Sequence, residues 1–169
     1  RSISMDWGVG QRFDSSVEKE VIYDAFGRPR AFGWTVSGAK FGFNLSYNAQ
    51  NLVDTLEYPE VLGQRFAVSY EYDSDDSVIA VRDRAGKPLW QVLGTNPAQL
   101  VTAEQFGLSV ETSSRFDQSN ALRFLETRTA GTPVQQLSYK WGADGLLETK
   151  TDLGLGAQES YEHDAWGRL

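Results

Sequence analysis

Tyr23-Asp24-Ala25-Phe26-Gly27-Arg28-Pro29 and His163-Asp164-Ala165-Trp166-Gly167-Arg168-Leu169 are two stretches that share four of their seven residues. They lie near opposite ends of a chain of 169 residues. Internal similarity at a distance is the sequence signature of a repeat protein. The chain is therefore interpreted first as a set of repeats, and its fold is predicted from the strands and turns that each repeat forms.

Four further stretches, 47–53, 72–78, 116–122 and 141–147, follow the same plan. An aromatic or His ring is followed by Asp, Asn or Gly, two free positions, then Gly, Asn or Asp, one free position and an apolar residue. The ring positions are 24, 25, 44, 25 and 22 residues apart. Because the gap of 44 equals two periods, we expect one degenerate unit near residue 94, within the poorly matching stretch 90–112. A weaker copy begins at Trp7-Gly8.

Each position of the plan has a physical role. Asp or Asn after the ring can accept a hydrogen bond from a backbone N–H two residues on, which forms an Asx-turn. The fifth position holds residue types that tolerate a positive φ, so that a short loop can reverse the chain into a hairpin. Those residues are Gly27, Asn51, Asp76, Asn120, Gly145 and Gly167. The ring before the loop is expected to close the incoming strand on its buried face.

Alternation of apolar and polar residues predicts strands on either side of these loops. The clearest rows cover 41–48, 66–72 and 137–141, and a period of two indicates a strand with one buried face. Pro97 would suit a first helical position, but a helical turn within 96–106 is less favoured than a strand. Second, looser turns are expected at 37–38, 62–63, 85–86, 130–131 and 154–156. The predicted fold class is all-β, built from repeated antiparallel hairpins.

Composition excludes several kinds of site. The chain has no cysteine and one histidine, which rules out disulfides, a Cys/His catalytic pair and a zinc site with two or more histidines. The net charge of −7 argues against nucleic acid as a partner. The longest aliphatic run, 78–81, is too short to span a membrane.

The repeated pattern resembles the YD repeat of the RHS-repeat family, whose members show Tyr-x-Tyr-Asp-x-x-Gly-Arg-Leu. The resemblance covers residues 18–169 and is clearest in 139–169, where two copies follow each other. Tyr-Asp is complete only at 23–24 and 72–73, and Gly-Arg only at 27–28 and 167–168. The motif residues are Tyr23, Asp24, Gly27, Arg28, Tyr47, Asn48, Asn51, Tyr70, Tyr72, Asp73, Phe116, Asp117, Asn120, Tyr139, Trp141, Gly145, Tyr161, His163, Asp164, Gly167 and Arg168.

The resemblance implies a structural role. In RHS proteins, in bacterial toxin complexes and in teneurins, YD repeats form a coiled β-sheet that closes into a hollow shell, and in bacterial members the shell encloses a C-terminal toxin. Residues 1–169 are accordingly interpreted as one YD-repeat region of about seven units and as a fragment of a longer shell. The expected partners are the remaining shell segments and an enclosed toxin domain. The expected location is extracellular, after export by a bacterial secretion system.

Other functions remain open at this point. A carbohydrate- or cell-surface-binding module would present Trp34, Trp90 or Trp166 on a flat face. His163 is more readily explained as a substitute for the ring than as a catalytic base, and Asp73, Asp75 and Asp76 fail the spacing of an EF-hand. Pairs such as Glu57 with Glu60, or Glu71 with Asp73, are expected by chance among 23 acidic residues. No catalytic residue, metal ligand or cofactor is therefore assigned, and the chain is not expected to be an enzyme.

Overall fold

The computed structural model describes residues 17–169, so the weaker motif copy expected at Trp7-Gly8 lies outside it. The described residues form thirteen β-strands and no helix, which confirms the all-β prediction. Among these residues there is accordingly no helix that could cross a membrane. The chain divides into two compact units, with the boundary between Lys87 and Pro88.

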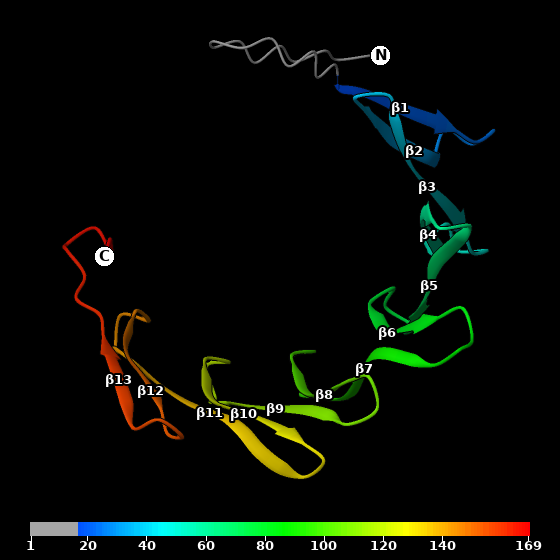
Figure 1. The fold of residues 1–169 in the computed structure, drawn as a ribbon. Helices are drawn as coiled ribbons and strands as arrows, with labels where there is room; N and C mark the ends of the chain where they lie inside the picture. Colours follow the sequence, from blue (N-terminus) through cyan, green and yellow to red (C-terminus); the bar gives the residue numbers. More distant parts are fainter. Residues whose placement is uncertain (1–16) are drawn as a thin grey trace. The chain divides into compact units, whose positions relative to one another are not determined.

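The first unit contains six strands, each antiparallel to the one before it, hydrogen-bonded in the order of the sequence. They run from blue to green in Figure 1. The strands are β1 (Val17–Tyr23), β2 (Pro29–Val36), β3 (Ala39–Tyr47), β4 (Val53–Val61), β5 (Gln64–Tyr72) and β6 (Val78–Asp83).

The second unit repeats this arrangement with seven strands, from green to red in Figure 1. They are β7 (Pro88–Thr95), β8 (Val101–Phe106), β9 (Val110–Phe116), β10 (Leu122–Thr129), β11 (Thr132–Trp141), β12 (Leu147–Asp152) and β13 (Ala157–Ser160). The alternating rows predicted as strands lie in β3, β5 and β11. Residues 96–106 form a loop followed by β8, so the strand is confirmed over the less favoured helical turn.

Each unit is a sheet one layer thick. Within each unit the strands of the described residues contact only their neighbours in sequence, so no second sheet packs on either face. Few side chains are buried as a result: Ala67, Val68, Ala80 and Leu137 are the buried apolar residues, at 3–9% exposed. Packing is therefore confined to side chains of adjacent strands on the same face.

One face of the first unit is aromatic. The register places Phe32 opposite Phe43 across β2 and β3, and their rings stack with centroids 4.9 Å apart. Trp34 meets both rings edge-on, and Tyr58 links Phe43 to Phe66 with centroid distances of 5.6 and 5.5 Å. We call these five residues the aromatic cluster. Pairs of this geometry contribute about 0.5–1.5 kcal/mol each beyond the area they bury.

The second unit has polar contacts across comparable strand pairs. The indole Nε1 of Trp90 donates to Glu104 at 2.7 Å between β7 and β8. The hydroxyl groups of Thr112 and Thr127 are 3.0 Å apart between β9 and β10, and Thr112 is buried. Hydrogen bonds thus replace ring contacts here, and they satisfy polar groups that partial burial removes from water.

The second set of turns lies where the sequence predicts it, but most of these turns are not looser than the others. Positions 37–38, 62–63 and 130–131 are two-residue turns in which both residues have a positive φ. Such turns match the twist of the flanking strands, which explains their occurrence in hairpins. At 83–87 the turn is a five-residue loop in which Asp83 accepts hydrogen bonds from the N–H groups of Ala85 and Lys87.

Candidate functional site

The repeated loops share one hydrogen-bond pattern. In the loop at Asp24, the N–H of Asp24 donates to the carbonyl of Arg28 at 2.8 Å, and the N–H of Gly27 donates back to the carbonyl of Asp24 at 3.1 Å. The side-chain Oδ1 of Asp24 accepts from the N–H groups of Phe26 and Arg28, both at 2.9 Å. One carboxylate oxygen thus binds two loop donors that strand pairing leaves free.

The same pattern holds the other loops. The side chains that accept these bonds are Asn48, Asp73, Asn96, Asp117 and Asp164. Gly142 keeps both backbone bonds of the pattern but has no side chain, and there Asp144 Oδ1 accepts from the N–H of Leu146 at 3.0 Å. A Cβ at position 142 would lie 2.6 Å from that oxygen. The glycine therefore leaves room for the substitute acceptor.

All six fifth-position residues have a positive φ, between 61° and 80°. Three of them are glycines, for which this conformation carries no penalty, and three are Asn or Asp, which tolerate it best among the other residues. The sequence pattern therefore identified these loops correctly.

The stretch 90–112 departs from the motif in sequence, yet it keeps the loop. Asn96 accepts from the N–H groups of Ala98 and Leu100, both at 3.0 Å, and Gln99 has a φ of 61°. Asn96 follows Asp73 by 23 residues and precedes Asp117 by 21 residues. The degeneration thus affects side chains, with Thr95 in the ring position and Gln99 in the fifth position, while the backbone is unchanged.

The rings connect successive repeats. Tyr47 Oη donates to the carbonyl of Pro29, Tyr72 Oη to that of Val53 and Trp141 Nε1 to that of Leu122, each at 2.7 Å. In every case the acceptor is the residue just after the loop of the preceding repeat. A hydrogen bond of this kind adds about 1 kcal/mol, so the rings do more than close a strand.

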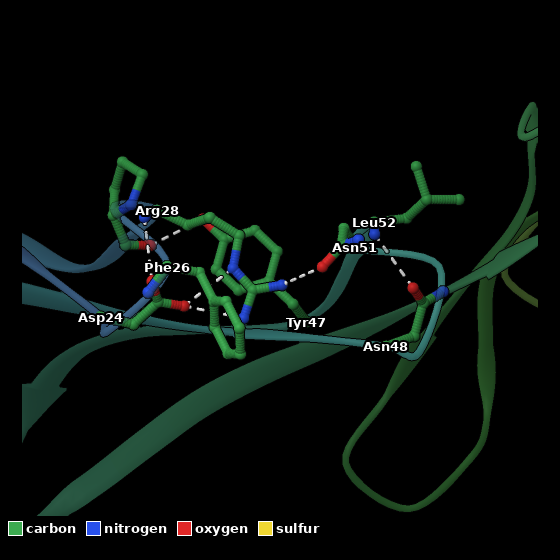
Figure 2. Close-up of polar contacts among 8 residues, drawn as sticks. Asp24, Phe26, Arg28, Tyr47, Asn48, Asn51 and Leu52 are labelled. Atoms are coloured by element: carbon green, nitrogen blue, oxygen red, sulfur yellow. Dashed lines mark hydrogen bonds and ion pairs between the residues drawn. The ribbon is translucent and has the colours of Figure 1, made fainter.

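Arg28 adds a charged link between two repeats (Figure 2). Its Nε and Nη2 bind Asp24 Oδ2 at 2.8 and 2.7 Å within its own loop. Its Nη1 donates to Asn51 Oδ1 in the next loop at 2.6 Å, and its guanidinium carbon lies 4.3 Å from the centroid of the Tyr47 ring. The planar, five-donor guanidinium is suited to such simultaneous contacts, which lysine could not make.

Two other loops have related contacts. Arg168 binds Asp164 through Nε and Nη2, as Arg28 binds Asp24. Arg123 binds Asp117 in the same way from a position six residues after it. The loops of Asn96 and Asp117 are joined by a long hydrogen bond of 3.4 Å from Asn96 Nδ2 to Asn120 Oδ1.

These contacts change the titration of the loop carboxylates. The Ser119 hydroxyl, the N–H of Ala121 and the Arg123 guanidinium hold the pKa of Asp117 at about 2. The backbone and side chain of Arg168 lower the pKa of Asp164. At Asp24, burial raises the pKa of the carboxyl group, but the hydrogen bonds from Arg28 and Phe26 together lower it by more. The pKa of Asp24 is therefore also lowered.

We expect Asp117→Asn to reduce the loss of stability in acid. Because the folded chain lowers the pKa of Asp117 to about 2, its contribution is complete above the unfolded value of about 3.9 and is lost as the pH falls through about 2. Urea unfolding between pH 5 and pH 2 should show a steeper decline in the wild type than in the variant. Asp75→Asn is the control, because the Asp75 carboxylate accepts no hydrogen bond among the described residues. Equal slopes for wild type and Asp117→Asn would contradict the assignment.

The remaining motif residues have less uniform positions. Tyr70 and Tyr139 lie half-buried on β5 and β11, and burial raises the pKa of Tyr70. The Tyr161 hydroxyl donates a hydrogen bond to Glu159, and this bond raises the pKa of Tyr161. Tyr23, in contrast to the other tyrosines of the ring position, is 59% exposed. Phe116 and His163 are half-buried rings in their predicted positions.

The residues that the sequence suggested for sugar binding, a carboxylate pair or a metal site have other roles or no common arrangement. Trp34 belongs to the aromatic cluster and Trp90 is bound to Glu104, whereas Trp166 is 82% exposed on a loop. Glu71 pairs with Arg82 at 2.6 Å, and hydrogen bonds from Arg82 lower its pKa. Among residues 17–169 no group of three or more acidic or histidine side chains is arranged to hold a metal ion.

The links between repeats were missed from the sequence, although one signal for them was present. Five of the six ring positions hold Tyr, Trp or His, each of which carries a hydrogen-bond donor, and only Phe116 does not. A purely apolar role would favour Phe at these positions as well. The preference for donors therefore indicated that the rings reach a polar partner.

Comparison with known proteins gives similarity in structure alone. No family model matches the chain, and no curated protein matches it in sequence. Crystal structures of TcdB2-TccC3-Cdc42 and TcdB2-TccC3 align over 90% and 89% of this chain, with TM-scores of 0.72 and 0.70 and identities of 10% and 11%. TcdB2-TccC3 without the hypervariable C-terminal region aligns over 82%, with a TM-score of 0.67 and 11% identity.

The chain spans only 8–9% of the length of these structures. At this level of identity the likeness concerns the fold: the same succession of antiparallel hairpins occurs in a short part of the TcdB2-TccC3 chains. The chain thus has the all-β fold of repeated antiparallel hairpins that its sequence pattern predicted.

Proposed function

We propose that this chain is a wall segment of an RHS/YD-repeat β-shell that encloses the C-terminal toxin, or another cargo, of a secreted bacterial toxin. The observation that carries the proposal is the single layer of each unit. A sheet whose strands contact only their sequence neighbours grows by adding hairpins and forms no second layer. Such a sheet is suited to bounding a space, whereas a sandwich fills its interior with side chains.

The likeness to TcdB2-TccC3, at TM-scores of 0.67–0.72, supports the same proposal. On this view the partners of the chain are neighbouring shell segments and the enclosed polypeptide. The loops reverse the chain at each repeat, and the Tyr47, Tyr72 and Trp141 links hold successive repeats at a fixed spacing. The segment contributes a wall and catalyses no reaction, and it needs no cofactor.

Protease protection tests the proposal in the full-length protein that contains this sequence. The cargo should resist a protease that degrades the same cargo when it is expressed alone. Gly33→Val should open the wall and make the cargo sensitive to the protease. The added Cβ would lie 2.6 Å from the Phe41 carbonyl oxygen, which forces β2 and β3 apart.

Gly42→Val is the matched control, because a Cβ at position 42 meets nothing within 4 Å. This variant should keep the cargo protected. A cargo that is degraded equally fast in the wild type and when free would contradict the enclosing role. So would a cargo that stays protected in a Gly33→Val protein whose wall segment is shown by hydrogen exchange to be open.

A further inference from the structure

A trough of about 640 Å³ lies on the first unit, over β1, β2 and β3. By strand alternation its charged residues Glu18, Glu20, Lys40 and Arg65 lie on the face opposite the aromatic cluster, although Phe32, Trp34 and Phe43 of that cluster are also among its lining residues. Alternation along the strands places Gly33 and Gly42 on this face, since Phe32 and Phe43 point to the other one. The register sets Glu20 opposite Gly33 and Gly33 opposite Gly42. The middle of the trough is therefore a row of two glycines with a carboxylate at one end.

Only one of the two glycines is required by the chain itself. A Cβ at Gly33 would lie 2.6 Å from the Phe41 carbonyl oxygen, whereas a Cβ at Gly42 would meet nothing within 4 Å. Gly42 also has no positive φ, so neither the backbone nor the packing explains it. Glycine inside a strand weakens the strand and often marks a place where a ligand or another backbone comes close.

The two ends of the trough carry opposite charges. Glu18 and Glu20 project from β1, and Lys40 and Arg65 line the side formed by β3 and β5. Among residues 17–169, Glu18, Glu20 and Lys40 form no ion pair, and Arg65 has only a long contact of 3.8 Å with Glu60. These charges are therefore available to a ligand that crosses the strands.

We propose that this trough binds an extended polypeptide segment, with a basic side chain at Glu18 and Glu20 and an acidic one near Arg65. A polypeptide supplies both charges at a suitable separation, and its backbone can lie close to the bare Cα atoms of Gly33 and Gly42. A sugar fits less well, because the aromatic rings on which sugars stack lie on the opposite face. The proposal does not depend on the shell function.

The test uses the full 169-residue chain and the peptide acetyl-Lys-Ser-Thr-Gly-Ser-Thr-Asp-amide, whose seven residues extend over roughly 23 Å. Isothermal titration calorimetry should show saturable binding. A peptide with serine in place of both charged residues should bind about tenfold more weakly or worse, equivalent to about 1.4 kcal/mol.

Gly42→Leu should weaken binding of the charged peptide by about tenfold or more, because the side chain occupies the floor of the trough, where a Cβ meets nothing within 4 Å. Its unfolding midpoint should not fall. Ser69→Leu, on the same face of β5 and outside the trough, should bind as the wild type does. Arg65→Glu serves as a second variant: it should weaken the Lys/Asp peptide and strengthen a peptide with lysine at both ends.

Three results would each overturn the proposal. They are the lack of saturable binding to the wild type, equal binding of the charged and uncharged peptides, and unchanged binding in folded Gly42→Leu. If Gly42→Leu does not fold, unchanged preference in Arg65→Glu would overturn it instead.

Discussion

Gly33→Val should lower the free energy of unfolding by about 3 kcal/mol, because overpacking against atoms that cannot relax is costly. The added Cβ would lie 2.6 Å from the Phe41 carbonyl oxygen and 3.1 Å from Gly42 Cα. Both are backbone atoms of the paired strand β3, so relief requires the two strands to separate. Chemical denaturation followed by tryptophan fluorescence measures the change, and hydrogen exchange at Trp34 and Phe41, which face each other across β2 and β3, locates it.

Gly42→Val is the matched control for this prediction. It makes the same substitution at the position directly opposite Gly33, where a Cβ meets nothing within 4 Å. Because valine favours strands over glycine, this variant should be neutral or more stable by up to about 1 kcal/mol. Equal destabilisation by both substitutions would show that the close approach of β2 and β3 at Gly33 is not as described.

Phe43→Ala should lower the free energy of unfolding by about 2–3 kcal/mol, toward the lower end of the range for large-to-small substitutions, since Phe43 is half-buried. The ring of Phe43 touches Phe32, Trp34 and Tyr58 at centroid distances of 4.9, 5.9 and 5.6 Å. Its removal therefore interrupts the aromatic cluster at its centre. Urea denaturation gives the free energy, and the near-ultraviolet circular dichroism of Trp34 reports the loss of the ring contacts.

Phe41→Ala, two positions earlier in β3, separates ring contacts from loss of apolar area. Phe41 is 45% exposed and belongs to none of the ring pairs found among the described residues. This variant should cost less than about 1 kcal/mol, in the range of substitutions away from well-packed sites. An effect as large as that of Phe43→Ala would mean that the aromatic cluster has no stabilising role of its own.

The loops were predictable from sequence because their causes are local. Asp24, Gly27 and their counterparts act on N–H groups two to four residues away, and a positive φ depends on the residue that adopts it. The same holds for the two-residue turns such as 37–38 and 62–63. Alternation then fixed the strands between the turns, because a strand with one apolar face needs a period of two.

The loop at Asn96 was predicted by the period and not by its residues. Thr95 and Gln99 stand where a ring and a glycine, Asn or Asp were expected, so only the gap of two periods indicated a degenerate unit there. The Asn96 side chain nevertheless makes both loop hydrogen bonds. The flanking strands hold Gln99 at a φ of 61°, a conformation that its own preferences would not select.

The contacts between repeats could not be derived from the sequence, because they join residues 18–24 positions apart. Which carbonyl Tyr47 reaches depends on the register between β2 and β3 and on the bulges near the loops. The trough at Gly42 depends on register in the same way: a shift of one residue between β2 and β3 would place the two glycines on opposite faces. Sequence thus predicted the repeat unit, and the structure was needed to show how units are joined.

The most direct test of the shell account is the structure of the full-length protein that contains this sequence, determined by cryo-electron microscopy. The account predicts that residues 17–169 form part of a one-layer wall, with the Tyr47, Tyr72 and Trp141 links intact. It also predicts that this wall bounds a volume holding density for another part of the polypeptide. Residues 17–169 packed face to face against a second sheet in a solid sandwich, with no enclosed volume, would contradict it.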